Sequence, residues 1–212
     1  MLDSILTWNK RELLNPGGTK TLILPRPRFY FTRISGPWDP SVVPSCLSGS
    51  WIDSDYSGCV WEADGYDLTG AFSTFDTNSG TFSLTAISNA QLINCIDNLF
   101  DHCNWLYSFQ VHENWLELVS AREAFANCSN LYTIDFKADN FPVLEDVTRM
   151  FYGSSSINDG DIYDTYTCLN GYGQHKFPPP FPSQHTDWCT GAVTDTYVQS
   201  QIPASWGGTG AG

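Results

Sequence analysis

The sequence predicts an α+β fold: a short β/α solenoid of about three 25-residue repeats, capped by an N-terminal β-rich region and an irregular C-terminal cap. Phe100, Phe125 and Phe151 recur at a nearly constant spacing, the second interval being longer than the first by a single position. A fixed period in this range is typical of repeats that bury their apolar faces only against one another. Within each period a strand-like stretch precedes a helix-like stretch, which gives the fold its predicted β/α alternation.

Residues 1–36 form a predicted basic arm. They contain six bases and two acids, a net charge of +4, whereas the rest of the chain contains four bases and 21 acids, a net charge of −17. This imbalance favours an arm that anchors the chain on an acidic neighbouring protein, and the acidic body disfavours nucleic acid as a partner. The predicted anchoring residues are Lys10, Arg11, Arg26, Arg28 and Arg33.

The arm is predicted to contain a short helix over residues 2–14 and strands at Thr21–Leu24 and Phe29–Ile34. Pro25 and Pro27 disfavour a central strand, because proline offers no amide hydrogen to a sheet. Two interpretations stay open: an extended edge that pairs with another subunit, or the ordinary first hairpin of the domain.

Residues 37–80 are predicted to be the β-rich N-terminal cap. Short apolar pieces between turn signals, such as Cys59-Val60-Trp61, favour irregular β structure. A cap is needed because an uncovered repeat end would expose an apolar patch.

Residues 81–156 contain the predicted repeats. Leu106–Val111 alternates with period 2, which indicates a strand, and strands are also predicted near residues 82–86 and 131–136. Leu118, Ala121 and Phe125 share one face of a predicted helix over residues 116–125. Strand then helix at this period is the leucine-rich-repeat arrangement. Its equivalent phenylalanines should stack, and Cys103 and Cys128 should pack as a buried column.

Residues 157–212 are predicted to form a C-terminal cap that ends in a flexible, glycine-rich tail from residue 208. Cys168, His175, His185 and Cys189 are weak candidates for a zinc site, because their spacing lacks the tight pairs of structural zinc sites. Packing within the cap is the favoured role of His185 and Cys189. Residues 158–164 offer clustered oxygens for calcium, but a turn with solvated carboxylates is favoured over an EF-hand loop.

Aromatic side chains within the repeats are the predicted binding residues. Tyr107, Trp115 and Tyr132 lie beside polar residues, which suits stacking on sugars or contact with proteins. Trp115 follows three polar residues and is expected to be the most exposed. No nucleophile elbow, phosphate-binding loop or dinucleotide fingerprint occurs in the sequence, so we predict no catalytic residues, metal or cofactor.

Residues 124–136, which read AFANCSNLYTIDF, resemble a unit of the BspA-like leucine-rich repeats, and Met150–Ile157 fits the same frame. The block from the proline run to Trp206 resembles a C-terminal cassette of such proteins in gut bacteria and their phages. The resemblance covers about residues 80–208. It implies a curved β/α solenoid used for surface adhesion, with no shared catalytic residues.

These observations lead to a functional hypothesis. Residues 1–11 do not read as a secretion signal, and no apolar run approaches the length of a membrane span, so neither export by that route nor insertion in a bilayer is expected. We therefore expect a non-enzymatic structural or adhesion protein on the virion surface of a tailed bacteriophage: a head or tail decoration, fibre or host-surface-binding module. It would dock on other virion proteins through residues 1–36 and contact a host glycan or protein through the repeats, as a homo-oligomer by analogy. The alternative is a bacterial cell-surface or secreted leucine-rich-repeat adhesin that binds host protein or glycan.

Overall fold

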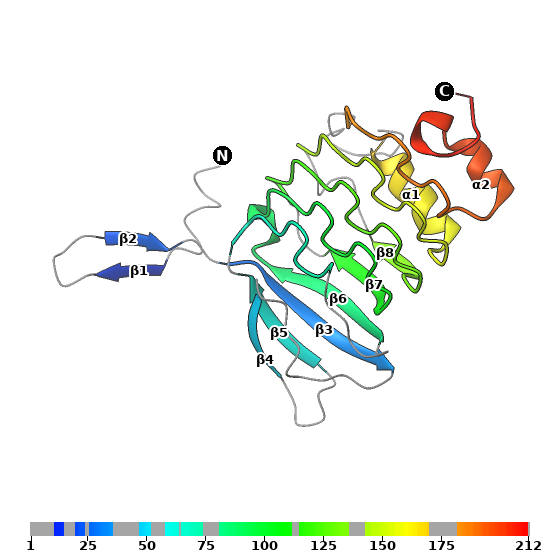
Figure 1. Cartoon of the computed structure of the whole chain (residues 1–212). Coiled ribbons are helices and arrows are strands. Elements are labelled where there is room, and N and C mark those ends of the chain that lie inside the picture. The colour runs from blue at the N-terminus through cyan, green and yellow to red at the C-terminus, as the bar shows by residue number, and fades with distance from the viewer. Residues whose placement is uncertain are drawn as a thin grey trace.

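A computed structural model describes the backbone of residues 11–14, 20–23, 26–35, 47–51, 58–63, 65–73, 81–111, 115–135, 143–169 and 182–211. Its first two strands, β1 (Arg11–Leu14) and β2 (Lys20–Ile23), form a separate antiparallel hairpin. In Figure 1 this hairpin projects away from the body of the molecule.

The other described strands form one mixed sheet in the order β4-β5-β3-β6-β7-β8. Pairing is antiparallel from β4 to β6 and parallel from β6 to β8. Two α-helices follow this sheet in the described part of the chain, and short 3₁₀ turns occur at Ala90–Leu92 and Ala204–Trp206. The bounds are β3 (Arg28–Ser35), β4 (Leu47–Trp51), β5 (Gly58–Ala63), β6 (Thr81–Ser88), β7 (Leu106–Val111), β8 (Thr133–Asp135), α1 (Asp159–Leu169) and α2 (Thr196–Gln201).

The N-terminal segment differs from its prediction. Arg11–Leu14 is a strand, although a helix was expected over residues 2–14, of which residues 1–10 lie outside the described part. The predicted strand at Phe29–Ile34 is confirmed as β3, but it lies in the interior of the sheet, between β5 and β6. Phe29 and Phe31 are buried there. β3 is therefore neither a free edge nor half of a first hairpin with β2. Pro25 and Pro27 precede this strand, so the sheet loses no hydrogen bond to them.

The predicted fold class, a β/α leucine-rich-repeat-like solenoid, is wrong. The described α-helices both lie within residues 159–201, after the predicted repeats, and the sheet is mixed, with four antiparallel strands beside its parallel part. Residues 116–125, predicted to be helical, are turns interrupted by a single-residue bridge at Ser120.

Backbone hydrogen bonding explains why these turns are not helices. Leu99 and Cys103 each donate their amide to a carbonyl three residues earlier, on Ile96 and Phe100. The amide of Phe100, between them, donates instead to the carbonyl of Ala124 in the next turn at 2.8 Å. An α-helix needs every amide for bonds to the fourth preceding residue, so amides shared between turns exclude it. These turns also bury residues that are three or four positions apart, so the apolar spacing alone does not distinguish them from a helix.

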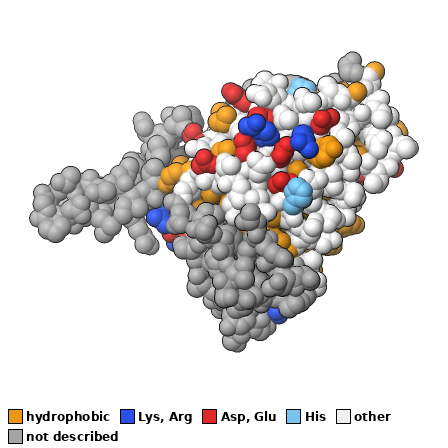
Figure 2. Space-filling model, viewed as in Figure 1, with side chains coloured by type: hydrophobic (Ala, Val, Ile, Leu, Met, Phe, Trp, Pro, Cys, Tyr) orange, Lys and Arg blue, Asp and Glu red, His pale blue; other side chains and the backbone are white. Residues whose placement is uncertain are grey.

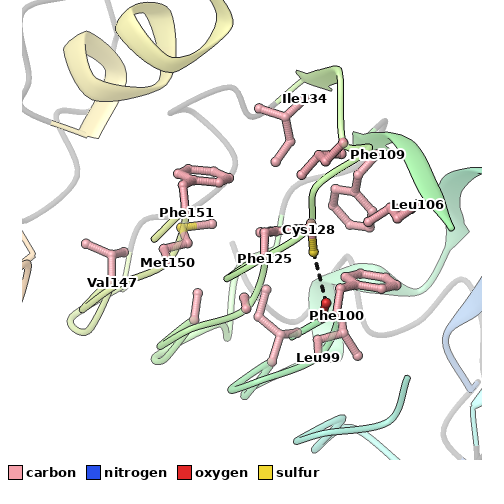
Figure 3. Packing of buried hydrophobic residues seen from close by; sticks show 14 of the residues in the cluster. Leu99, Phe100, Leu106, Phe109, Phe125, Cys128, Ile134, Val147, Met150 and Phe151 are labelled. Carbon is pink, nitrogen blue, oxygen red and sulfur yellow. Dashed lines mark hydrogen bonds between the residues drawn. The ribbon is translucent and has the colours of Figure 1, made fainter. Parts of the chain in front are cut away.

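A column of aromatic rings fills the space between the turns and the sheet. Phe72, Phe100, Phe125 and Phe151 stack with centroid distances of 5.1, 5.4 and 5.5 Å, and the edge of Trp188 closes the column at 5.2 Å. The predicted stacking of the three later phenylalanines is confirmed (Figure 3). Phe72 and Trp188 extend the column into both regions that were predicted to be caps.

Beside this column, the predicted burial of Cys103 and Cys128 is also confirmed. The Cys128 thiol donates to the carbonyl of Phe100 at 2.9 Å (Figure 3), and the Cys103 thiol donates to that of Phe72 at 3.0 Å. The hydroxyl of Ser154 donates in the same way to Phe125. Burial raises the pKa of both thiols far above the ordinary value, so they are not nucleophiles.

The C-terminal segment covers the end of the turns. Trp206 packs edge to face on Trp188 at 5.5 Å and stacks on His185 at 4.4 Å, while the buried Cys189 thiol donates to the carbonyl of Trp206 at 3.4 Å. The predicted packing role of His185 and Cys189 is confirmed. The tail predicted to be flexible from residue 208 is instead hydrogen-bonded, and the Gly210 amide donates to Ile202 at 2.9 Å.

Substitution of Gly153 tests the backbone geometry of the turns. Its φ is +70°, and a Cβ there would lie 2.6 Å from Oδ1 of Asn127. Because left-handed backbone costs an L-residue about 1–2 kcal/mol, Gly153→Ala should lower the free energy of unfolding in urea by about that amount. The matched control is Gly65→Ala, where nothing lies within 4 Å and the change should stay within about 0.5 kcal/mol. Equal effects of the two substitutions would contradict this account of the turns.

Candidate functional site

The structure brings together two of the three predicted binding residues. Tyr107 and Tyr132 are 37% and 46% exposed, and their rings stack at 5.7 Å with an interplanar angle of 20°. Trp115, expected to be the most exposed of the three, is fully buried and packs edge to face on Phe109 at 6.1 Å. That prediction is wrong, because the polar residues before Trp115 do not carry its ring to the surface.

Local backbone irregularity explains the exposure of the tyrosines. In the pairing of β6 with β7, Phe82 lies opposite Leu106 and Ser83 lies opposite Ser108, so Tyr107 is an extra residue in its strand. Such a bulge re-aims a side chain that strict alternation would turn into the core. Tyr132 directly precedes β8, and its amide donates to the carbonyl of Tyr107 at 2.8 Å. The Asn158 amide donates in turn to Tyr132 at 2.9 Å, which places these three residues in one row.

A second row of polar residues precedes the tyrosines in each turn. Oδ1 of Asn104 accepts bonds from the amide and the hydroxyl of Ser129 at 3.2 and 2.7 Å. Nδ2 of Asn130 donates to the Asn104 carbonyl, and the Ser156 hydroxyl donates to the Ser129 carbonyl. All of these residues are exposed. We call the two rows together the neutral stripe; its residues are Asn104, Tyr107, Ser129, Asn130, Tyr132, Ser156 and Asn158.

The neutral stripe lacks formal charge although the chain has a net charge of −13. The three stretches that supply it, Cys103–Val111, Ala124–Ile134 and Met150–Asn158, contain no Asp, Glu, Lys or Arg. Acids stand just outside these stretches, at Asp101, Asp135 and Asp159. Hydrogen-bonding groups and two phenol rings therefore dominate the chemistry of this surface.

Charged side chains gather on the face of the molecule that Figure 2 shows. Arg122 lies between Asp97 and Asp146, at 3.4 and 3.7 Å. Arg149 pairs with Glu123 at 2.8 Å and lies 4.3 Å from the ring centre of Tyr152. Since each of these cations is already paired, we assign this face a structural role.

The predicted anchoring bases do not form one group. Arg28 and Arg33 lie within β3 and Arg26 lies two residues before it, and Arg28 pairs with Glu62 at 2.9 Å. Arg11 lies in β1 of the separate hairpin, and Lys10 lies outside the described residues. The basic charge of residues 1–36 is thus divided between two parts of the structure.

Several of the candidate metal ligands have structural partners within the fold. Asp159 begins α1, contrary to the turn expected at residues 158–164, and its carboxylate accepts bonds from the amide and hydroxyl of Thr194 and the amide of Asp195. Asp161 accepts the Ile134 amide at 3.1 Å. Of the zinc candidates, His175 lies outside the described residues. Within the described ranges, no three His, Cys, Asp or Glu side chains are placed to hold a metal ion.

Neither described α-helix has the length and apolar character that crossing a bilayer requires. Comparisons with protein-family models, with curated proteins and with solved structures found no match. The resemblance to BspA-like repeats therefore stays a prediction.

Sequence reasoning missed the asparagines of the neutral stripe. Asn104, Asn130 and Asn158 are ordinary loop residues when each is read alone. The available signal was composition: each of three stretches beside the phenylalanines lacks Asp, Glu, Lys and Arg and contains an exposed asparagine.

Asp161 gives the edge of the sheet a testable pH dependence. Burial raises the pKa of its carboxyl above 3.8, and repulsion from Asp164 and Asp135 adds to this effect, while the Ile134 amide opposes it. A raised folded-state pKa means that stability is greatest below the unfolded value and falls as pH rises through the folded one. Asp161→Asn keeps an acceptor for Ile134 and removes the charge, so urea unfolding should show less loss of stability as pH rises above 3.8.

The exposed Glu117→Gln variant serves as the control for removing one negative charge, and it should follow the wild-type pH profile. If Asp161→Asn also follows that profile, burial of the Asp161 carboxylate does not affect stability.

Proposed function

We propose that this protein is a non-enzymatic recognition protein: a structural or adhesion component of a tailed-phage virion that contacts the host cell surface through the neutral stripe. The observation that carries the proposal is the exposed Tyr107–Tyr132 pair, stacked at 5.7 Å on a hydrogen-bonded backbone. Tyrosine is favoured in recognition surfaces because it supplies a large, rigid contact with a polar end and little rotamer entropy to lose.

Rigidity of the underlying turns supports this role. The amides of Tyr132 and Asn158 are bonded to the preceding turn, and the side chains of Asn104 and Ser129 are bonded to each other. A surface that is ordered before it meets a ligand loses less entropy on binding, so weak individual contacts add to a useful affinity.

The roles of the carboxylates favour binding over catalysis. Asp97 accepts the hydroxyl of Ser120 and the amide of Arg122, Asp146 accepts the amide of Thr148, and Asp159 holds Thr194. The bonds of Asp97 and Asp159 join separate segments of the fold, and that of Asp146 lies within one turn. A general acid or base must instead direct its carboxyl toward a substrate.

For attachment to the particle we propose the β1–β2 hairpin, a narrower element than the whole of residues 1–36, because β3 belongs to the sheet. The hairpin has four residues in each strand and projects from the body (Figure 1). An isolated two-stranded hairpin is marginally stable in water, so contact with a neighbouring virion protein would stabilise it.

Cell binding tests the contact surface. The labelled protein should bind cells of a susceptible host in flow cytometry, and the double substitution Tyr107→Ala with Tyr132→Ala should reduce binding at least about tenfold, because it removes both rings. Tyr197→Ala, at a 72% exposed tyrosine on α2, is the matched control and should bind like the wild type. Undiminished binding by the double variant would exclude the neutral stripe as the contact surface.

Deletion of residues 1–25 tests attachment. The variant keeps the whole of the six-stranded sheet and should unfold in urea near the wild-type midpoint, yet it should be missing from purified particles probed with an antibody to the body. Particles that contain the shortened chain at the wild-type level would show that the hairpin is not the anchor. Finding the full-length protein on bacterial cells, with none in particles, would favour the bacterial adhesin instead.

A further inference from the structure

We infer that the neutral stripe binds an uncharged saccharide. This inference rests on the proposed function, since it specifies the ligand class of the same surface. Three properties of the stripe carry it: its aromatic faces, its half-used amides and its lack of charge.

The aromatic faces suit the apolar side of a sugar ring. The two tyrosine rings stack with their centroids 5.7 Å apart and an interplanar angle of 20°, so each covers one face of the other. A ligand can contact the outer faces, the ring edges and the hydroxyl groups. A pyranose has a C–H face that packs on such a surface and hydroxyls at its rim. The two tyrosines are 37% and 46% exposed, so they can bury further area on binding.

The amides of the stripe are held in place but keep free hydrogen-bonding atoms. Oδ1 of Asn104 accepts from Ser129, Nδ2 of Asn130 donates to Asn104, and Oδ1 of Asn158 accepts the Gly160 amide at 2.8 Å. Within the described residues, the other atom of each amide, Nδ2 of Asn104, Oδ1 of Asn130 and Nδ2 of Asn158, has no protein partner. They offer two donors and one acceptor, and sugar hydroxyls can satisfy both kinds.

The charge pattern selects among ligands. The stripe contains no formal charge, and Asp101, Asp135 and Asp159 flank it in a chain of net charge −13. Negative potential over this surface disfavours saccharides with carboxylate or sulfate groups. A protein partner generally requires a hydrophobic centre with buried anchor residues, whereas this stripe has two rings among amides and hydroxyls. An uncharged saccharide fits these properties best.

Titration of the full-length protein with oligosaccharides tests the inference. Calorimetry should detect at least one ligand in a panel of neutral gluco-, galacto- and manno-oligosaccharides, and weaker binding to their uronic-acid or sialylated counterparts. Tyr132→Ala should weaken the binding about tenfold, and Tyr197→Ala should leave it unchanged. Asn104→Asp and Asn158→Asp preserve the Oδ1 acceptors for Ser129 and Gly160 and replace the free donor by an anionic oxygen. Each of these substitutions should weaken saccharide binding by a similar factor without lowering the urea midpoint.

Three results would overturn the inference: no binding to any neutral saccharide, binding that Tyr132→Ala leaves unchanged, or tighter binding to the anionic saccharides. Treated host cells separate this inference from the proposed function. If labelled protein still binds after periodate oxidation of cell-surface glycans but not after protease treatment, the recognition function stands and its ligand is a protein. If untreated host cells are not bound at all, the recognition function itself fails, whatever the calorimetry shows.

Discussion

The structure depends on one feature of its backbone: amides within each turn alternate between a bond inside that turn and a bond to the next turn. The Phe125 amide donates to Met150 in the neighbouring turn, while the amides of Ala124 and Ala126 donate within their own. Because neighbouring turns share hydrogen bonds, each turn lies in register with the one before it. Rings at equivalent positions must then stack, in the buried phenylalanine column and in the exposed tyrosine pair alike.

This alternation requires unusual backbone geometry at fixed places. Asn98, Glu123, Arg149 and Asp187 occupy one equivalent position and all have φ of 53° or 54°; His102, Asn127, Gly153 and Gly191 occupy a second, four residues later, also with positive φ. Left-handed backbone is costly for residues other than glycine, so it persists only where surrounding bonds impose it. Here the bonds between turns do so, and the charged side chains at the first position gain ion pairs such as Arg149–Glu123.

The sequence predicted the contacts of this fold better than its elements. The period of Phe100, Phe125 and Phe151 located a real stack, because only residues at equivalent positions can meet across turns. The same pattern predicted helices wrongly, since overlapping turns bury every third or fourth residue as a helix does. Phe72 and Trp188 escaped notice because their spacing from the neighbouring rings of the column departs from that period. Of the predicted binding residues, Tyr107 and Tyr132 are exposed as expected from their polar neighbours. The same reasoning misplaced Trp115, which is buried against Phe109, a contact that local sequence does not reveal.

The neutral stripe ends where the hydrogen-bonded turns give way to α1. In the row of Tyr107 and Tyr132 the next position is Asn158, whose Oδ1 accepts the Gly160 amide as α1 begins, and an aromatic side chain there could not make this bond. The helix in turn protects the edge of the sheet, where Asp161 takes the Ile134 amide that a further strand would otherwise occupy. The beginning of α1 therefore both covers the edge of the sheet and ends the row of tyrosines. The recognition surface that we propose is therefore limited to two rings and the amides beside them, which suits a short uncharged ligand better than an extended one.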